Sequence, residues 1–336
     1  MRVGVLGAGS WGTALAHLLA SGGGHDVDLW AFEPEVVAGI NSEHRNPLYT
    51  SDVSLPGSIV ASGELKTVVE RAQMVLSVVP TQFVRGVLPE VGRHLSPGVP
   101  IVVCSKGIER KSLATMERVF ADELPGHTRE GYCALSGPSF AAEVVRGMPT
   151  NVTVASRSVE LARRVQSAIA TRFFRVYTTD DVTGVELGGA LKNVIAIVTG
   201  GSDELELGYN TRAAIITRGL AEITRLAVNL GARPETLLGL SGVGDLVLTC
   251  TSDLSRNRQV GRLLARGRHL SGIEREMKMV AEGVPTTESA YQLAHGRNID
   301  MPITEQLYQV LYQDKSVAEG MMALQDRALK DEWTPY

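Results

Sequence analysis

Residues 3–20 read VGVLGAGSWGTALAHLLA, and this stretch decides the fold. Its first part, Val3–Leu6, is a short apolar run typical of a buried strand, and Thr13–Ala20 has the small and apolar residues of a helix that packs on a sheet. The motif Gly7-x-Gly9-x-x-Gly12 stands between them. In this context the motif predicts a dinucleotide-binding turn. Gly7 permits the tight turn, Gly9 lets the backbone approach a pyrophosphate, and Gly12 allows close helix–strand packing.

Strand and helix patterns alternate along the chain as far as about residue 180. Apolar strand patterns occur at residues 27–32, 74–79, 101–104, 132–135, 152–155 and 173–177, with helical patterns such as 81–91 and 112–120 between them. Strands that alternate with helices form a parallel sheet. After about Asp181 only helical patterns follow, at residues 185–200, 211–230, 256–265, 287–295 and 303–311.

These patterns predict an α/β protein of two domains. Residues 1–180 are expected to form an N-terminal dinucleotide-binding domain with a Rossmann-type, doubly wound, mainly parallel sheet. Residues 181–336 are expected to form an all-α C-terminal domain that holds the substrate and the catalytic groups. A chain of 336 residues is long enough for two such domains.

The composition is that of a globular enzyme. Of the residues, 44% are hydrophobic and 21% are charged, the formal net charge is -4, and no long basic run occurs, so we expect no nucleic-acid partner. The chain starts on a strand, has no hydrophobic signal segment, and shows no apolar run of membrane-spanning length. These features predict no membrane insertion and a cytoplasmic location.

Cysteine usage also indicates the inside of a cell. The three cysteines, Cys104, Cys133 and Cys250, are an odd number without the spacing of a metal site, so we predict no metal. Cys104 and Cys133 lie in apolar strand patterns and are expected to be small core residues.

Glu186–Ser202, which reads ELGGALKNVIAIVTGGS, is the second informative stretch. Its apolar residues recur with helical spacing and its other positions are small, which predicts a helix buried nearly all round. The one charged residue between Leu187 and Ser202 is Lys192. A buried lysine must be paired, neutral or bound to an anion. Two interpretations remain open: a catalytic lysine with a lowered pKa, or a lysine whose long side chain reaches the surface.

The end of the second strand bears on the choice between NAD and NADP. An acidic residue there bonds the ribose hydroxyls of NAD, whereas an arginine accommodates the 2′-phosphate of NADP. This chain has Phe32 and Glu33 at that place, and no Arg or Lys occurs between Arg2 and Arg45. The pattern favours NAD. NADP remains open because a distant basic residue could fold back, and Glu33 could be only a helix-start residue before Pro34.

Other polar residues follow strand patterns or open helices. Lys106 follows the strand IVVC and is either a surface lysine or a cleft residue, while Gly137 and Ser139 offer donors for a small polar substrate. Asp245 ends a glycine-rich turn, and Ser255-Arg256-Asn257 opens a helix with Ser255 at the N-cap. An arginine at a helix start forms an anion site, although simple capping is the alternative. Together with the dinucleotide motif, this helix start favours a phosphate-bearing substrate.

Long motifs in this chain resemble those of the cytoplasmic NAD(P)-dependent sn-glycerol-3-phosphate dehydrogenases. The resemblance runs from Val3 to about Leu324. The motifs are GAGSWGTALA, SKGIE, LSGPSFAAEV, VELGGALKNVIAI, NTRAAIITRGLAEI, LSGVGDLVLTCTSDLSRNRQVG and MPITEQLYQVLY. The resemblance implies interconversion of dihydroxyacetone phosphate and sn-glycerol 3-phosphate, usually by a homodimer. In bacteria this reaction supplies the glycerol phosphate of phospholipids.

The resemblance also implies roles for individual residues. Lys192 would be the catalytic proton donor and acceptor. The substrate-binding candidates are Lys106, Gly137, Ser139, Lys192, Asp245, Ser255, Arg256 and Asn257. The cofactor-binding candidates are Gly7, Gly9, Ser10, Trp11, Gly12, Phe32, Glu33, Lys106, Ala141, Arg256, Val280 and Glu282.

The chain departs from the family pattern at three places. Phe32-Glu33 is similar to the NAD-linked eukaryotic members, Glu204 and Glu206 stand in a stretch that is glycine-rich in the family, and Thr50-Ser51 follows Tyr49 where Leu-Pro is usual. Two other functions remain open from the residues alone. They are a related dehydrogenase of β-hydroxyacids or sugar acids, and a non-catalytic NAD(H) sensor.

Overall fold

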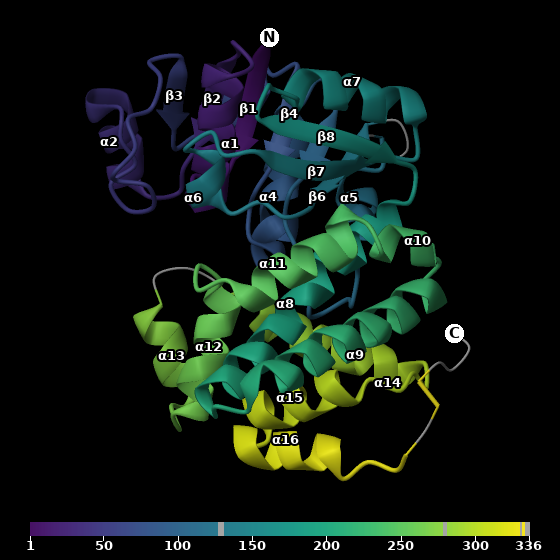
Figure 1. Cartoon of the computed structure of the whole chain (residues 1–336). Helices are drawn as coiled ribbons and strands as arrows, with labels where there is room; N and C mark the ends of the chain where they lie inside the picture. Colours follow the sequence, from purple (N-terminus) through teal and green to yellow (C-terminus); the bar gives the residue numbers. More distant parts are fainter. Residues whose placement is uncertain (127–130, 278–280, 330, 333–336) are drawn as a thin grey trace. The chain divides into compact units, whose positions relative to one another are not determined.

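The computed structural model describes residues 1–126, 131–277, 281–329 and 331–332 (Figure 1). The chain divides into two compact units. The sheet unit consists of Met1–Ser105 and Met116–Val182, and the helical unit consists of Lys106–Thr115 and Thr183–Tyr336. The segment Lys106–Thr115 thus belongs to the helical unit, which no sequence pattern indicated. A functional division into domains 1–180 and 181–336 stays a prediction.

The sheet unit contains eight strands in the order β3-β2-β1-β4-β5-β6-β7-β8. Neighbouring strands are parallel except β6 and β7, which are antiparallel. The strands are β1 (Arg2–Leu6), β2 (Asp26–Trp30), β3 (Ile59–Ser62), β4 (Met74–Ser77), β5 (Ile101–Val103), β6 (Tyr132–Ser136), β7 (Thr150–Ala155) and β8 (Phe174–Thr179). The predicted Rossmann-type, mainly parallel sheet is therefore confirmed.

The strand order shows where in the sheet the glycine motif lies. From β1 the chain builds outward to β2 and β3 on one side, then returns to add β4 on the other side of β1. In register, Val3 of β1 lies opposite Val27 of β2 and Met74 of β4. The turn that follows β1 is therefore at the switch point of the sheet, where α/β proteins bind their ligands.

Helices cover both faces of this sheet. They are α1 (Ser10–Ser21), α2 (Pro34–Glu43), α3 (Leu65–Val69), α4 (Thr81–His94), α5 (Met116–Glu123), α6 (Ala141–Val144) and α7 (Val159–Ile169). Val3 and Val5 share one buried core cluster with Leu15 of α1. Gly4, between them, faces the other way, because a Cβ added there would lie 2.8 Å from the carbonyl oxygen of Val68 in α3.

Some predicted boundaries in the sheet unit are wrong. Strand β2 ends at Trp30, so Phe32 lies beyond it, and β3 was not predicted because its four residues carry too little periodicity. Helix α5 begins at Met116 instead of Ser112, since residues 106–115 pack in the helical unit.

The helical unit contains no strand among its described residues, as predicted. Its helices are α8 (Val182–Glu204), α9 (Gly208–Asn229), α10 (Pro234–Leu237), α11 (Asp245–Thr251), α12 (Arg256–Ala265), α13 (Leu270–Glu276), α14 (Gly283–Gly296), α15 (Pro302–Tyr312) and α16 (Val317–Gln325), with a π-helical turn over Leu240–Gly244. The predicted turn ahead of Asp245 is therefore helical, because the chain passes directly from the π-helical turn into α11.

Helix α8 is the core of the helical unit. Every residue from Leu187 to Ser202 is buried, which confirms the predicted all-round burial. Neighbouring helices approach it through glycines. A Cβ added to Gly261 of α12 would lie 1.8 Å from the carbonyl oxygen of Ile197, so these two backbones are in contact.

The same helix passes a length-and-composition test for a membrane span, with a mean hydropathy of 1.3. The expectation that no run reaches this length is therefore wrong. The bent pair Pro234–Thr251 and Arg256–Ala265 passes the test only when taken as one span. In α8, however, 89% of the most apolar window is buried inside the protein, which is a property of core helices.

The loop between α8 and α9 carries the two unusual glutamates. Helix α8 continues through Glu204, whose carboxylate accepts two hydrogen bonds from Arg266, the C-cap residue of α12, at 2.7 and 3.1 Å. Glu206 has a φ of 54°, a left-handed conformation that glycine adopts with less strain. The backbone at this position therefore has a conformation typical of glycine, although the residue is a glutamate.

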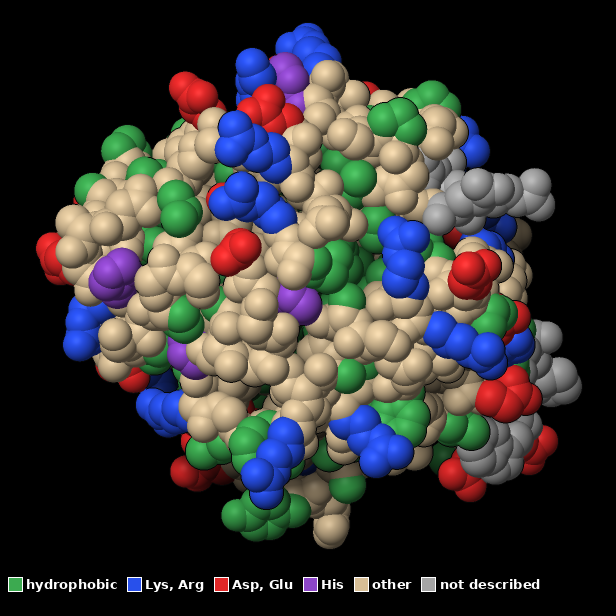
Figure 2. All heavy atoms as spheres, turned by 90° about the horizontal axis from the view of Figure 1, so that it is seen from above, with side chains coloured by type: hydrophobic (Ala, Val, Ile, Leu, Met, Phe, Trp, Pro, Cys, Tyr) green, Lys and Arg blue, Asp and Glu red, His purple; other side chains and the backbone are tan. Residues whose placement is uncertain are grey.

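The surface charges are mixed in sign, as the composition predicted, and the cysteines are buried. On the face seen in Figure 2, Lys and Arg side chains are interspersed with acidic, polar and apolar ones instead of forming one continuous basic patch. Cys104, Cys133 and Cys250 are buried free thiols, which confirms Cys104 and Cys133 as core residues.

Candidate active site

The glycine turn of the sheet unit has the geometry of a phosphate-binding loop. Gly7 has a φ of 108°, and its N–H donates to the carbonyl oxygen of Trp30 at 3.1 Å. A Cβ added to Gly12 would lie 1.8 Å from the carbonyl oxygen of Gly7, so only glycine fits there. Helix α1 begins at Ser10, followed by Trp11, with Gly9 at its N-cap and no acidic residue in its first turn. A pyrophosphate at this helix start would meet backbone N–H groups and the positive end of the helix dipole.

Two cofactor candidates follow β2 in the same unit. Phe32 is 82% exposed, and Glu33 is the N-cap residue of α2. A carboxylate oxygen of Glu33 accepts a hydrogen bond from the hydroxyl of Tyr49 at 2.8 Å. Glu33 is therefore a helix-start residue, as one interpretation held, and it is also held by a side-chain partner.

The turn after β6 carries Gly137, Ser139 and Ala141. Gly137 has a φ of 137°, and a Cβ there would lie 2.9 Å from the Cα of Val152. The hydroxyl of Ser139 donates to the carbonyl oxygen of Gly137 at 2.9 Å, and Ala141 begins α6. These residues belong to the sheet unit, whereas the other substrate candidates belong to the helical unit.

In the helical unit, Lys192 of α8 meets Asp245 at the start of α11. The Lys192 Nζ lies 2.9 Å from Oδ1 of Asp245 and donates to the hydroxyl of Thr249 at 2.7 Å. The other carboxylate oxygen of Asp245 accepts from the Nζ of Lys106 at 2.7 Å. Lys192 is only 6% exposed, so the structure excludes the surface interpretation.

This cluster of Lys192, Asp245 and Lys106 has two cations and one anion. Burial lowers the pKa of Lys192 to about 8, the carboxylate of Asp245 opposes that shift, and the ammonium of Lys106 adds to it. Burial alone would raise the pKa of Asp245, but the two lysines lower it, so this carboxylate stays ionised. Lys192 therefore loses its proton at a lower pH than an ordinary lysine does.

Asparagine side chains connect the cluster to α12. The Oδ1 of Asn193 accepts from the Nδ2 of Asn257 at 2.9 Å, and the Nδ2 of Asn193 donates to the carbonyl oxygen of Lys106 at 3.4 Å. The Oδ1 of Asn257 accepts from the backbone N–H of Gly283 at 3.0 Å. Asn257 thus has a structural role, and its contact with substrate stays a prediction.

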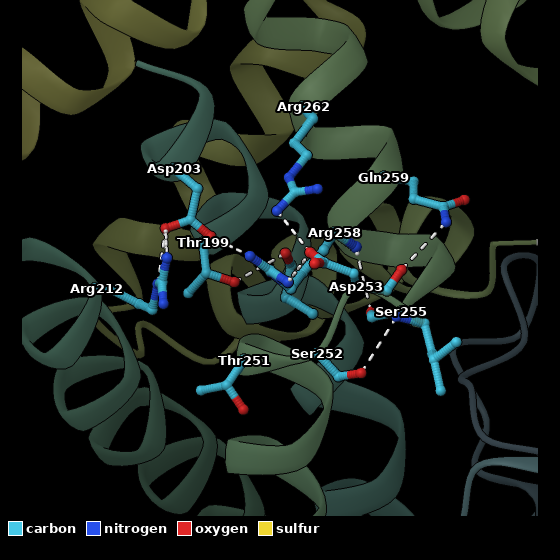
Figure 3. Close-up of polar contacts among 12 residues, drawn as sticks. Thr199, Asp203, Arg212, Thr251, Ser252, Asp253, Ser255, Arg258, Gln259 and Arg262 are labelled. Atoms are coloured by element: carbon cyan, nitrogen blue, oxygen red, sulfur yellow. Dashed lines mark hydrogen bonds and ion pairs between the residues drawn. The ribbon is translucent and has the colours of Figure 1, made fainter. Parts of the chain in front are cut away.

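The start of α12 is held by the ion-pair network drawn in Figure 3. The guanidinium of Arg258 is buried and pairs with Asp203 of α8 and with Asp253, the latter at 3.0 Å. Asp203 also accepts from Arg212 of α9 at 2.7 Å, and Asp253 pairs with Arg262 at 2.7 Å. These pairs fix the turn ahead of α12 to α8 and α9.

Ser255 ends that turn as the N-cap residue, and Arg256 is the first residue of α12. The hydroxyl of Ser255 accepts from the backbone N–H of Arg258 at 3.3 Å, which confirms the predicted N-cap. Burial lowers the pKa of Arg256, and the carboxylate of Glu282, the N-cap residue of α14, opposes this shift. Val280 lies outside the described residues.

The structure therefore joins Lys106, Lys192 and Asp245 in one cluster, and it places Asn257 next to Asn193. Sequence reasoning missed Thr249 and Asn193. Thr249 lies four residues after Asp245, a spacing that brings side chains together on a helix. That signal was lost because the segment before it was interpreted as a turn.

A dinucleotide turn at the switch point of the sheet, together with a buried lysine paired to a carboxylate, defines a Rossmann-type NAD(P)-dependent oxidoreductase. Comparison with known proteins agrees. Residues 2–162 match the family model described as NAD-dependent glycerol-3-phosphate dehydrogenase N-terminus, and residues 181–322 match that of the C-terminus. The chain belongs to the NAD-dependent glycerol-3-phosphate dehydrogenase family.

Individual relatives cover nearly the whole chain. A glycerol-3-phosphate dehydrogenase [NAD(P)+] of Citrifermentans bemidjiense is 53% identical over 331 residues, which are 98% of each chain. The crystal structure of glycerol-3-phosphate dehydrogenase from Coxiella burnetii has a TM-score of 0.92 at 37% identity, over 97% of this chain and 99% of that one. The enzyme of Saccharomyces cerevisiae has a TM-score of 0.81 at 28% identity, over 97% and 99% of the two chains. The resemblance stated from the motifs is thereby confirmed.

Proposed function

We propose that this enzyme catalyses reversible hydride transfer between NAD(P)H and dihydroxyacetone phosphate, giving sn-glycerol 3-phosphate. The observation that carries the proposal is the buried Lys192–Asp245 pair with a lysine pKa of about 8, in a chain of this family. A ketone reduction needs one group that delivers a proton to the developing alkoxide, and Lys192 has the burial and the pKa for that task.

The glycine turn fits a dinucleotide, because the missing side chain at Gly12 lets the backbone of Gly7 lie against α1, whose N-terminus is free of side-chain caps. When bound there, NAD(P)H supplies the hydride for the substrate carbonyl. We assign the substrate phosphate to Arg256, Asn257 and the N-terminus of α12, which Ser255 caps. The fixed turn ahead of α12 orients these groups before substrate arrives.

In this proposal Lys192 donates the proton in ketone reduction and accepts it in alcohol oxidation. Asp245 holds the ammonium in place through Oδ1, and Lys106 shares the same carboxylate through Oδ2. The cluster carries a net positive charge, which favours an anionic substrate and stabilises negative charge that develops on the substrate oxygen.

The remaining proposals concern the location, the oligomeric state, the metabolic role and the cofactor of the enzyme. We assign it to the cytoplasm, without membrane insertion, as a homodimer that supplies glycerol phosphate for phospholipid synthesis. Support comes from the resemblance of the motifs and, for α8, from its burial inside the helical unit. NAD is the preferred cofactor in this proposal, with NADP as the alternative.

The direct test measures oxidation of NADH and NADPH with dihydroxyacetone phosphate and with unphosphorylated dihydroxyacetone. We expect a higher kcat/KM with the phosphate ester and with NADH. Arg256→Ala should lower kcat/KM for the phosphate ester by about 10–100-fold, because a charge-assisted contact is worth about 1.5–3 kcal/mol. The same variant should change the rate with dihydroxyacetone much less.

Arg275→Ala serves as the matched control, because Arg275 is exposed on α13 and donates to the carbonyl oxygen of Ser271. It should leave both substrates unaffected. Equal losses for both substrates in Arg256→Ala would refute the assignment of the phosphate to Arg256. No turnover of dihydroxyacetone phosphate with either cofactor would refute the proposed function.

The two directions of the reaction should have opposite pH dependence. Lys192 must be protonated for reduction, so kcat/KM for dihydroxyacetone phosphate should be flat below its pKa of about 8 and should fall at higher pH. Lys192 must be neutral for oxidation, so kcat/KM for sn-glycerol 3-phosphate should rise up to the same pH and then level off. Initial rates between pH 7 and pH 10 measure both limbs, and limbs of the same sign would contradict the role of Lys192.

A further inference from the structure

A short segment after α2, Asn46–Thr50, is attached to the glycine turn. Asn46 is completely buried, and its Nδ2 donates to the carbonyl oxygen of Ala8 and to the hydroxyl of Thr13, both at 2.8 Å. The hydroxyl of Thr13 in turn donates to the same carbonyl oxygen at 3.1 Å. A buried, fully bonded amide of this kind fixes the segment relative to the turn.

The same asparagine shapes the segment itself. Its Oδ1 accepts from the backbone N–H groups of Leu48 and Tyr49, both at 3.2 Å, which is a local side-chain turn. The hydroxyl of Ser10, at the start of α1, donates to the carbonyl oxygen of Tyr49 at 3.4 Å. The backbone of Tyr49 is therefore held from two sides, next to the residues that we assign to the pyrophosphate.

The side chain of Tyr49 then reaches the acidic residue that follows β2. Its hydroxyl donates to Oε1 of Glu33 at 2.8 Å. Burial raises the pKa of Tyr49 to about 12, and the carboxylates of Glu33 and Glu35 add to the shift. Tyr49 therefore stays a protonated donor across the physiological range, and a hydrogen bond to a charged acceptor is stronger than a neutral one.

We infer that Tyr49 is a positioning residue for cofactor choice: it fixes the Glu33 carboxylate so that the enzyme prefers NAD(H) to NADP(H). With Oε1 bonded to Tyr49, Oε2 is the oxygen that accepts from a ribose hydroxyl. A 2′-phosphate at the same place meets a carboxylate that cannot rotate away. The inference rests on the proposed NAD(P)-dependent function.

The arginine nearest to Glu33 in sequence lies directly before the same segment. Arg45 donates through Nη1 to the carbonyl oxygen of Ser51 at 2.9 Å. That bond holds the guanidinium against the backbone that follows the segment. In this proposal the fixed carboxylate of Glu33 is the group that discriminates against NADP.

The test measures binding as well as turnover. Dissociation constants for NADH and NADPH are determined by calorimetry for the unmodified enzyme and for Tyr49→Phe, Glu33→Gln and the double variant. Tyr49→Phe keeps the ring and removes the hydroxyl. We expect it to reduce the preference for NADH over NADPH by about 3–10-fold, because one hydrogen bond to a charged group is lost. In the Glu33→Gln background the same change should have less than about a twofold effect, because the two residues act as one unit.

Tyr177→Phe is the matched control, since Tyr177 is an exposed tyrosine of β8 in the same unit. It should leave both dissociation constants unchanged. Three results would overturn the inference: an unchanged preference in Tyr49→Phe, an equal loss of affinity for both cofactors, or a Tyr49→Phe effect that persists in the Glu33→Gln background. Any of these, with NADH-dependent reduction of dihydroxyacetone phosphate intact, leaves the proposed function standing. Failure of the unmodified enzyme to bind either cofactor overturns both.

Discussion

Replacing Lys192 by alanine is expected to lower kcat by about 10²–10⁴-fold, the usual contribution of a positioned general acid. Folding should survive, because Asp245 keeps Lys106 as its counterion at 2.7 Å and no charge is left unpaired. Affinity for NADH should also survive, since the glycine turn belongs to the other compact unit. Single-turnover kinetics separate the chemical step from binding.

Two further variants sharpen this test. Lys192→Met has a similar volume and no proton to donate, so it should be as inactive as the alanine variant and better packed. Lys315→Ala removes a lysine of the same unit that bonds the side chains of Gln306 and Gln309, and it should keep normal turnover. A Lys192 variant that retains more than about a tenth of the normal kcat would show that another group moves the proton.

The second large effect is expected for stability. Asp245→Asn leaves the ammonium groups of Lys106 and Lys192 without their shared carboxylate, and Lys192 is only 6% exposed. Removal of one partner from a buried ion pair costs about 3–5 kcal/mol. The free energy of unfolding from urea titration at pH 7 should fall by about this amount.

The pH dependence of this loss has a defined sign. In the unmodified protein, the pKa of Asp245 is lowered, so the stability that it contributes is present at neutral pH and is lost only as the pH falls through that lowered pKa. In Asp245→Asn, the group that raised the pKa of Lys192 is gone, and the pKa of Lys192 falls further. Lys192 then becomes neutral as the pH rises, so the loss of stability should be smaller at pH 9 than at pH 7.

Asp300→Asn is the control for this prediction, because Asp300 pairs with Arg327 at the surface. An exposed ion pair contributes about 1 kcal/mol or less, so this variant should be nearly as stable as the unmodified protein. A loss below about 1 kcal/mol in Asp245→Asn, or a loss that grows between pH 7 and pH 9, would contradict the buried charge cluster.

Local patterns were enough to predict the main elements of the fold. The glycine motif gave the turn after β1, because part of its geometry is local: a Cβ added to Gly12 would lie 1.8 Å from the carbonyl oxygen of Gly7, five residues earlier. Helix α8 was predictable because its apolar and small residues repeat with the helical period over its whole length. Short elements such as β3 and α6 were missed, since four residues carry too little periodicity.

The candidate site was only partly predictable. Lys192 was found because it interrupts an apolar helix, and Asp245 and Ser255-Arg256-Asn257 were found from turn and capping signals. Thr249 and Asn193 were missed because their importance lies in contacts with Lys192 and Asn257. The link from Asn46 through Tyr49 to Glu33 was also missed, since an asparagine and a tyrosine in a loop carry no pattern of their own.

The sequence by itself determined the class of the protein: a dinucleotide turn, a mainly parallel sheet and a buried helix with a single lysine. These features depend on neighbouring residues, whose geometry follows from backbone conformation and periodic burial. Only the tertiary structure decided which partners those residues have. Lys106 and Asp245 are 139 positions apart, and the segment that carries Lys106 leaves the sheet unit to pack in the helical unit. Ion pairing and the pKa of Lys192 depend on such distant contacts, because burial and charge are properties of the packed core and not of the local chain.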